Sequence, residues 1–255
     1  MPHKVTLFGL PFDSLTMGET LAAIERLIAQ KKSAMLFTPN VQRVVAASRD
    51  ASIRQIYRQA DLLLPDGMPL YWSSRLLRRG LKERVAGSDL LFTFCERAAR
   101  KRYRVFFLGA APGVAADAAD KLRVKYPGLI VAGTYSPPFG FEADRQEIDK
   151  IIALLETAEP DLLFLAFGLP KEEHFLWQNK NCIRVPVSIG VGASFDFAAG
   201  RATRAPRWIQ DLGFEWMFRL LQDPRRLWKR YLFSNAYFIY LLAKELVSEP
   251  RHWAT

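Results

Sequence analysis

Polar side chains that could take part in catalysis follow apolar runs of this sequence. Asp66 stands in a Pro-Asp-Gly turn at 65–67, directly after one such run. A carboxylate held on a sharp turn can act as a general base when its surroundings give it a suitable pKa. The alternative is an ordinary turn aspartate, which is the commoner use of an Asp-Gly pair.

A cationic segment supplies a second kind of chemistry. Arg84 opens the sequence Arg-Val-Ala-Gly-Ser-Asp at 84–89, in which Gly87 and Ser88 are suited to the start of a helix. The free amides of a helix start, together with a guanidinium group, can hold a phosphate. The alternative is an arginine that only contacts solvent.

Thr38 and Asn40 follow another apolar run, in the sequence Thr-Pro-Asn. Both side chains can hydrogen-bond to a ligand at the end of a strand. Asn40 can equally well cap the helix that follows it.

Two glycine-rich turns complete the set. Gly109 and Gly113 join a strand to a helix, but they fit neither the dinucleotide-binding pattern nor a phosphate-binding loop of the Walker type. Gly190 and Gly192 are followed by Asp196, a pattern suited to contacts with a nucleotide base or ribose. Close packing of the backbone is the alternative for these glycines.

The elements between these segments predict an α/β fold. Short apolar runs without polar alternation, separated by amphipathic stretches, are typical of parallel strands covered on both faces. The sequence predicts a doubly wound, mostly parallel, Rossmann-like core over 1–199 and a helical appendage over 200–255, with a helix break near Asp223-Pro224. A capping box at Thr16 and Glu19 begins the first helix. Strands are expected at 5–9, 34–37, 61–64, 105–108, 129–132, 162–167 and 185–189, and further helices near 41–59, 88–102, 112–125, 143–157 and 171–180.

The last fifth of the chain is basic and aromatic. Residues 200–255 contain ten Lys or Arg and five Asp or Glu, which is half of the net charge of +10. The uncharged run at 231–243 is too short to span a bilayer, which needs about 20 apolar residues. It is suited to lying in a membrane interface, with the basic residues toward lipid headgroups. The alternative is a solvated helix face.

Composition excludes several classes of protein. With 255 residues, 50% of them hydrophobic, the chain is neither disordered nor collagen-like nor a disulfide scaffold. Cys95 and Cys182 lie far apart and share no ligand spacing with the three histidines, so a reducing compartment is expected and a zinc site is not. The start of the sequence does not resemble a signal peptide.

Taken in order, these segments resemble the WecG/TagA/CpsF glycosyltransferase family. The match covers nearly the whole chain, spacing included, and eight motifs in sequence order are hard to obtain by chance. The motifs are TPN (38–40), PDG (65–67), RVAGSD (84–89), FLGAAPG (107–113), GLPKEE (168–173), GVGASFDFAAG (190–200), RAPRWIQDLGFEW (204–216) and RLLQDPRRLWKRY (219–231).

The resemblance implies an inverting, metal-independent transferase without a cofactor, at the cytoplasmic face of the bacterial plasma membrane. Such enzymes move a sugar from a UDP-activated donor to a polyprenyl-diphosphate-linked sugar during synthesis of cell-surface polysaccharides. It implies that Asp66 is the general base, and that Thr38, Asn40 and Arg84 contact the donor. The nucleotide would lie on the glycine-rich turns and Asp196. The matching arginines of the membrane-associating tail, which close over the active site, are Arg219, Arg226 and Arg230.

One residue departs from the family pattern. Glu172 stands in Pro-Lys-Glu-Glu, where relatives usually carry Pro-x-Gln-Glu. An ionised carboxylate only accepts hydrogen bonds, whereas an amide also donates them. Either Glu172 reads a different sugar hydroxyl of the donor, or it pairs with a nearby arginine. The donor therefore stays open between UDP-N-acetylmannosamine, UDP-glucose and other UDP-hexoses.

Three other classes of function fit the sequence less well than the transferase does. A nucleic-acid-binding protein would explain the basic tail, but no helix-turn-helix, zinc or RNP-like pattern supports it. A nicotinamide-dependent oxidoreductase lacks its glycine fingerprint. A scaffold without catalysis is disfavoured by the intact TPN, PDG and RVAG motifs. The expected partners are the two substrates and a membrane surface, with self-association open and nucleic acid excluded.

Overall fold

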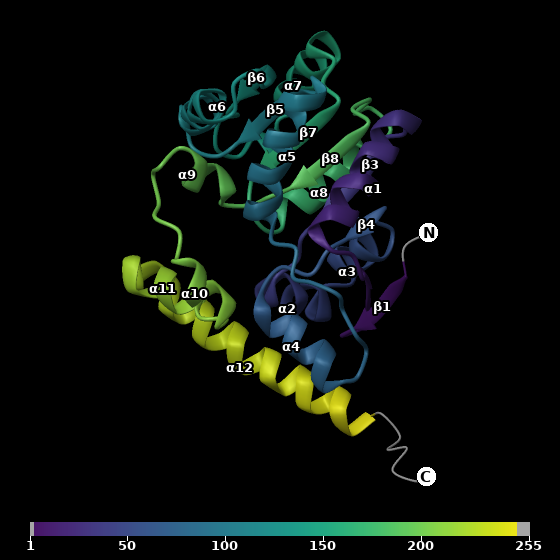
Figure 1. Ribbon diagram of the computed structural model, residues 1–255, viewed down its shortest axis with the longest axis vertical. Helices are drawn as coiled ribbons and strands as arrows, with labels where there is room; N and C mark the ends of the chain where they lie inside the picture. Colours follow the sequence, from purple (N-terminus) through teal and green to yellow (C-terminus); the bar gives the residue numbers. More distant parts are fainter. Residues whose placement is uncertain (1–2, 249–255) are drawn as a thin grey trace.

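The computed structural model describes residues 3–248, without the side chains of Arg226 and Arg230. Six parallel strands form its central sheet, in the order β4-β3-β8-β7-β5-β6 (Figure 1). This arrangement confirms the predicted doubly wound α/β fold. The strands are β3 (Ala34–Phe37), β4 (Leu62–Leu63), β5 (Arg104–Gly109), β6 (Ile130–Tyr135), β7 (Leu162–Ala166) and β8 (Val187–Gly190).

Helices cover both faces of the sheet. Successive strand residues alternate between two apolar clusters, because side chains of a strand point to opposite faces. Leu163 and Leu165 belong to one cluster, for example, and Leu162 and Phe164 to the other. One face is covered by α1 (Met17–Gln30), α5 (Gly87–Lys101), α6 (Val114–Lys125) and α9 (Ser194–Ala198), and the other by α2 (Val41–Arg49), α3 (Ala51–Arg58), α7 (Arg145–Ala158) and α8 (Lys171–Asn179).

Polar side chains cap the starts of α1 and α3, and the sequence analysis predicted only the first of these caps. The capping box before α1 is present, with Thr16 and Glu19 each bonded to the backbone of the other. The single helix expected over 41–59 is two helices. Asp50 separates them, because its side chain accepts hydrogen bonds from the amides of Ser52 and Ile53 and so caps α3.

The predicted strand at 5–9 is wrong in its extent and in its partner. Strand β1 (Lys4–Leu7) ends earlier and pairs antiparallel with β2 (Leu10–Asp13), in a separate two-stranded ribbon. Phe8 and Gly9 form the turn between them, with φ of 53° and 74°. Two residues with positive φ are the requirement of a type I′ hairpin turn, which closes an antiparallel pair.

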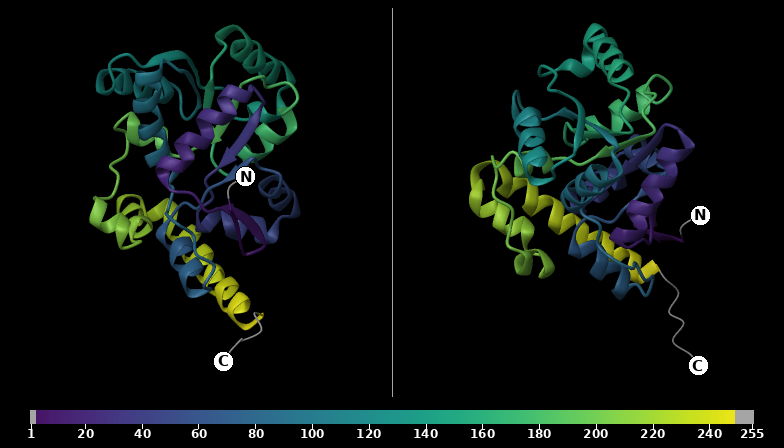
Figure 2. Two further views of the ribbon diagram at one scale, coloured as in Figure 1. Left: turned by 45° about the vertical axis from the view of Figure 1, so that its right-hand side comes forward. Right: turned by 45° about the horizontal axis from the view of Figure 1, so that its top comes forward.

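The C-terminal elements pack along one side of the core. They comprise α10 (Arg207–Asp211), α11 (Glu215–Gln222) and the long α12 (Pro224–Ser248), and the break at Asp223-Pro224 is where the sequence predicted it. Figures 1 and 2 show α12 running beside α2 and α4 (Met68–Leu76). A 3-10 turn, η1 (Phe141–Ala143), precedes α7. Helices α4 and α9 were not expected from the sequence.

Two contacts attach α12 to the N-terminal ribbon. The rings of Phe8 and Phe238 lie 5.0 Å apart. Two turns further along the helix, Glu245 accepts a hydrogen bond from the amide of Phe8 at 2.9 Å and pairs with Arg79. Between residues 3 and 248, no helix is both long enough and apolar enough to cross a membrane.

Candidate active site

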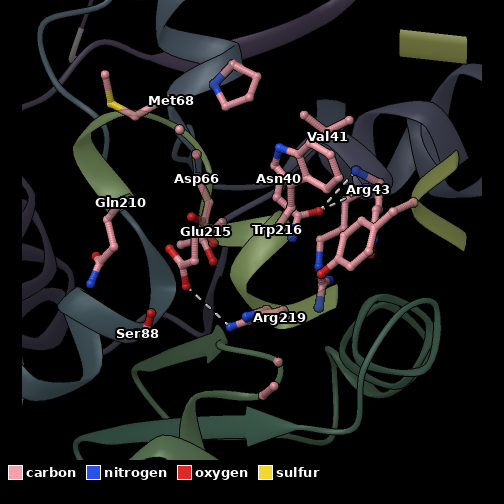
Figure 3. Close-up of a pocket in the computed structure, with 18 of the residues that line it drawn as sticks. Asn40, Val41, Arg43, Asp66, Met68, Ser88, Gln210, Glu215, Trp216 and Arg219 are labelled. Carbon is pink, nitrogen blue, oxygen red and sulfur yellow. Dashed lines mark hydrogen bonds and ion pairs between the residues drawn. The ribbon is translucent and has the colours of Figure 1, made fainter. Parts of the chain in front are cut away.

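A cavity of about 1210 Å³ opens at the carboxyl ends of β3, β4, β7 and β8. The loops after these strands line one part of it, and α4, α11 and α12 line the rest (Figure 3). Ligands of open parallel sheets bind beyond the carboxyl ends of the strands. We therefore identify this cavity as the candidate active site, which the core and the C-terminal helices build together.

Backbone hydrogen bonds join the loops that carry the predicted catalytic residues. The amide of Asp66 donates to the carbonyl of Pro39 at 3.1 Å, and the amide of Val85 donates to the carbonyl of Pro65 at 2.9 Å. Gly67 has a φ of 104°, a conformation that favours glycine and turns the chain directly into α4. The TPN, PDG and RVAG segments thus form one layer around the cavity.

Thr38 is placed by the same packing. Its side chain is buried, and its hydroxyl donates to the carbonyl of Gly190 at 3.4 Å. A Cβ atom on Gly87 would lie 2.6 Å from the Thr38 hydroxyl, so only glycine fits there. Thr38 lines the cavity.

Asn40 caps α2, which was the alternative to a ligand contact, and it also lines the cavity. Its side-chain oxygen caps α2 by accepting from the amides of Gln42 and Arg43, at 3.1 and 3.3 Å. The oxygen is therefore committed to the helix, and the Nδ2 group is the part of Asn40 suited to donating to a ligand.

The pKa of the Asp66 carboxyl group is raised above its ordinary value. Burial raises the pKa of its carboxyl group, and the neighbouring charge of Glu215 raises it further. These effects outweigh the lowering by Arg84, Arg219 and Arg204, so that the pKa is about 6. Figure 3 shows the Asp66 and Glu215 carboxylates close together in the cavity. Asp66 is ionised at neutral pH and basic enough to accept a proton.

Three arginines surround Glu215, and we call Arg84, Arg204 and Arg219 the arginine cluster. Glu215 lies 3.8 Å from Arg84 Nη1, 3.8 Å from Arg204 Nε and 3.5 Å from Arg219 Nη2. Arg84 comes from the loop before α5, whereas the other two come from the C-terminal part of the chain. The cluster therefore joins the two predicted parts of the protein at the cavity.

Asp89 fixes two members of this cluster from the core side. Its carboxylate bonds both terminal nitrogens of Arg204, at 2.5 and 3.0 Å, and Arg84 Nη2 at 3.1 Å. Although burial opposes it, these arginines lower the pKa of Asp89. Asp89 is thus a firmly ionised anchor that holds the two guanidinium groups in place.

Of the two alternatives for Glu172, a contact with the donor sugar or a pair with an arginine, the structure shows the arginine pair. Its side chain is fully buried, and one oxygen accepts from Arg43 Nη2 at 2.7 Å. The other oxygen accepts from the amides of Gly168 and Gly192, each at 2.9 Å. Arg43 also pairs with Glu173, which accepts a hydrogen bond from the hydroxyl of Tyr57. We call Arg43, Glu172 and Glu173 the buried triad. Glu172 joins the loops after β7 and β8 rather than facing the cavity.

The glycine-rich turns divide between packing and cavity. Gly192 lines the cavity, as does Asp196 on α9. Gly190 makes room for the buried triad, since a Cβ there would lie 2.6 Å from Glu172 Oε2. Gly109 likewise faces the carbonyl of Ala166, 2.8 Å from where its Cβ would be. Gly109, Gly113 and Gly190 do not line the cavity, although Gly190 lies beside it and accepts a hydrogen bond from Thr38.

Residues 5–252 match the Glycosyl transferase WecG/TagA/CpsF family. The chain belongs to this family. It is 35% identical over 225 residues to an N-acetylglucosaminyldiphosphoundecaprenol N-acetyl-beta-D-mannosaminyltransferase of Bacillus spizizenii, covering 88% of this chain and 84% of that protein. Proteins of the same name from Bacillus subtilis and Staphylococcus aureus strain MRSA252 are 33% and 29% identical, covering 94% of this chain and 91% and 92% of theirs.

Membership of a glycosyltransferase family directs attention to residues that sequence reasoning gave no role. Arg204 and Glu215 stand in the RAPRWIQDLGFEW motif, which carried the resemblance, but their spacing shows no partner. Only the fold brings them beside Arg84 and Asp66. Of the three tail arginines predicted for the site, Arg219 lines the cavity, whereas the side chains of Arg226 and Arg230 lie outside the described residues. In the part of the chain that the structure describes, no three His, Cys, Asp or Glu residues are grouped so that they could hold a metal ion.

Proposed function

We propose that this protein is an inverting glycosyltransferase of cell-surface polysaccharide synthesis. It transfers a hexose or N-acetylhexosamine from a UDP-sugar to a sugar linked to polyprenyl diphosphate, at the cytoplasmic face of the bacterial plasma membrane. The observation that carries this proposal is one cavity lined by Asp66, a carboxylate with a pKa of about 6, and by Arg84 and Arg219 of the arginine cluster, with Arg204 beside them on Glu215.

The two groups match the two ends of a single displacement. Asp66 accepts the proton of the acceptor hydroxyl, while the oxygen of that hydroxyl forms a bond to the anomeric carbon of the donor sugar. The bond from that carbon to the UDP oxygen breaks, and negative charge develops on the departing diphosphate. One displacement from the face opposite the leaving group inverts the anomeric configuration.

The arginine cluster stabilises the leaving group. Arg84 and Arg204 are held by Asp89 and need not reorganise when charge develops, which is the condition for strong electrostatic catalysis. Arg219 comes from α11, so the C-terminal helices contribute to the chemistry itself. Guanidinium groups supply the positive charge that the diphosphate requires, and the proposal therefore needs no metal ion.

The mouth of the cavity suits a lipid-linked acceptor. Trp72 and Leu76 of α4 and Ile239 of α12 line the cavity, yet their side chains are 45%, 58% and 66% exposed. Large apolar side chains exposed together mark a surface that contacts another molecule or a membrane. We propose that this rim rests on the membrane, with the basic residues of the tail toward anionic headgroups.

The relatives' names give the first donor to test. They describe N-acetyl-beta-D-mannosaminyltransferases acting on N-acetylglucosaminyldiphosphoundecaprenol. Glu172 departs from the family pattern, but both of its oxygens are hydrogen-bonded, to Arg43 and to two backbone amides. This residue therefore gives no reason to exclude N-acetylmannosamine, and UDP-N-acetylmannosamine and UDP-glucose head the panel.

The test is release of UDP from a panel of UDP-hexoses, with a short polyprenyl-diphosphate-linked N-acetylglucosamine as acceptor. Wild type should release UDP with one donor only when the acceptor is present, and Asp66→Asn should reduce the rate about 10²–10⁴-fold. Asp211→Asn is the matched control, because it removes one exposed carboxylate of the C-terminal helices outside the cavity. Turnover by Asp66→Asn at the wild-type rate would refute the assignment of the base.

A further inference from the structure

Glu215 occupies an unusual position for an acidic residue of a site that handles phosphates. It is the first residue of α11, its side chain is 22% exposed, and it pairs with all three members of the arginine cluster. Figure 3 shows its ion pair with Arg219. A donor diphosphate that bound to these arginines would meet the Glu215 carboxylate in the same place.

The contacts of Glu215 are loose. Its separations from the three arginines are 3.5–3.8 Å. Charge-assisted N–H···O bonds are about 2.7–2.9 Å long. Asp89, which uses the same Arg84 and Arg204, reaches 2.5–3.1 Å. Glu215 is therefore held by charge rather than by well-formed hydrogen bonds.

The cluster also has donors to spare. The Nε atoms of Arg204 and Arg219 are buried and have no hydrogen-bond partner among the described residues. Leaving a buried donor unbonded costs free energy, which a better acceptor recovers. A diphosphate carries more charge and more acceptor oxygens than one carboxylate, so it satisfies this cluster better than Glu215 does.

We propose that Glu215 is a resident anion that occupies the diphosphate subsite of the donor and is displaced when the donor binds. This inference rests on the proposed function, because it takes the arginine cluster as the diphosphate site. In the empty enzyme Glu215 keeps the three guanidinium groups together against their mutual repulsion. After transfer it competes with UDP for the same arginines and so favours release of this product.

Displacement of Glu215 has a consequence for Asp66. The charge of Glu215 raises the pKa of this neighbouring carboxyl group. A phosphate in the same place supplies negative charge in its stead. Asp66 therefore keeps a negatively charged neighbour, and its basicity, from the empty enzyme through to the donor complex.

The experiment measures how tightly UDP and inorganic pyrophosphate bind to wild type, Glu215→Gln and Asp211→Asn by calorimetry at pH 7.5 and low salt. Glu215→Gln keeps the shape of the side chain but removes its charge. We expect this variant to bind both probes about tenfold more tightly than wild type, which corresponds to about 1.4 kcal/mol. Asp211→Asn makes the same change in net charge away from the cavity and should bind as wild type does.

Unchanged or weaker binding by Glu215→Gln would overturn this inference and leave the proposed function standing, since wild type would still bind UDP. No binding of either probe to wild type or variant would overturn both. Should Glu215→Gln unfold, Glu215→Ser provides the same comparison with a small polar side chain at the helix start. Tighter binding by either variant supports the inference.

Discussion

Two groups of arginine and carboxylate side chains lie at or beside the cavity, and they differ in how closely their charges approach one another. In the buried triad, Arg43 contacts two glutamates, and Glu172 uses both of its oxygens in bonds of 2.7–2.9 Å. In the arginine cluster, three guanidinium groups share Glu215 at 3.5–3.8 Å. The same chemical groups therefore serve different purposes.

This difference distinguishes charged side chains that stabilise the fold from charged side chains that can bind a ligand. In the Arg43–Glu172 pair both carboxylate oxygens are already bonded, so Glu172 has no acceptor left for a ligand and fixes the backbone around it. A cluster with long contacts and unbonded donors can form better hydrogen bonds when an anion binds, and these bonds contribute to the affinity for the anion. Residue type alone does not separate the two groups.

The largest expected effect concerns the stability contributed by the buried triad. Glu172→Ala leaves Arg43 with one partner and removes the acceptor of two backbone amides, so we expect the free energy of unfolding to fall by about 3–5 kcal/mol. Glu172→Gln should lose less because its oxygen can still accept. Denaturation by guanidinium chloride measures both. A loss below about 1 kcal/mol in Glu172→Ala would show that the triad is not a structural element.

The arginine cluster should show the opposite behaviour. Arg219→Gln should lower kcat/KM about 10²–10³-fold, because one donor to the developing charge on UDP is lost. Its free energy of unfolding should change by about 1 kcal/mol or less, since the side chain makes one loose ion pair and one partly exposed cation–π contact with Phe197. The UDP-release assay and the same denaturation series give the two numbers. A stability loss with unchanged kcat/KM would reverse the comparison.

Asp66 should trade stability for activity in a pH-dependent way. Its pKa is about 6 in the folded protein, above the ordinary value of 3.8, so ionisation on raising the pH costs stability. Asp66→Asn should therefore be more stable than wild type by about 1–3 kcal/mol at pH 7.5, and this gain should vanish below pH 4.

The activity of wild type should change in the opposite direction, with kcat/KM rising with pH through about 6. Glu215 and the three arginines of the cluster face this carboxyl group, and Glu215→Gln should move the rise to lower pH. Thermal denaturation at several pH values and a pH–rate profile measure these effects. A stability difference that does not depend on pH would contradict the assigned pKa.

The smallest effect provides the reference for the others. Arg100 and Glu96 form an ion pair on the surface of α5, with side chains 72% and 45% exposed. Arg100→Ala should change the free energy of unfolding by about 0.5 kcal/mol or less, because such pairs contribute little in water. A larger loss would indicate that all ion pairs of this protein are unusually strong, which would weaken the contrast between triad and cluster.

Much of the fold could be predicted from the sequence because it depends on local patterns. The apolar runs that became β3, β5 and β7 are continuous, as buried parallel strands require. The ribbon of β1 and β2 was not predicted, because Phe8-Gly9 is not one of the residue pairs typical of a tight hairpin turn. The break at Asp50 needed the observation that its side chain caps a helix.

The site was predictable only where one segment contains the signal. Asp66, Thr38 and Arg84 follow strands or open a helix, and the structure places all three at the cavity. Glu172 and its partner Arg43 are 129 positions apart, so their pairing depends on how the loops after β3, β7 and β8 meet. The same holds for Glu215, whose neighbours come from distant segments.

The attachment of α12 bears on the order in which the molecule assembles. Phe8 and Glu245 are 237 positions apart. During synthesis their contact cannot form until residue 245 has emerged, whereas the central sheet, whose last strand ends at Gly190, can form earlier. Because α12 walls the cavity, a nascent chain acquires a folded core well before it acquires a closed active site. Catalytic competence is therefore expected to lag behind protease resistance during translation.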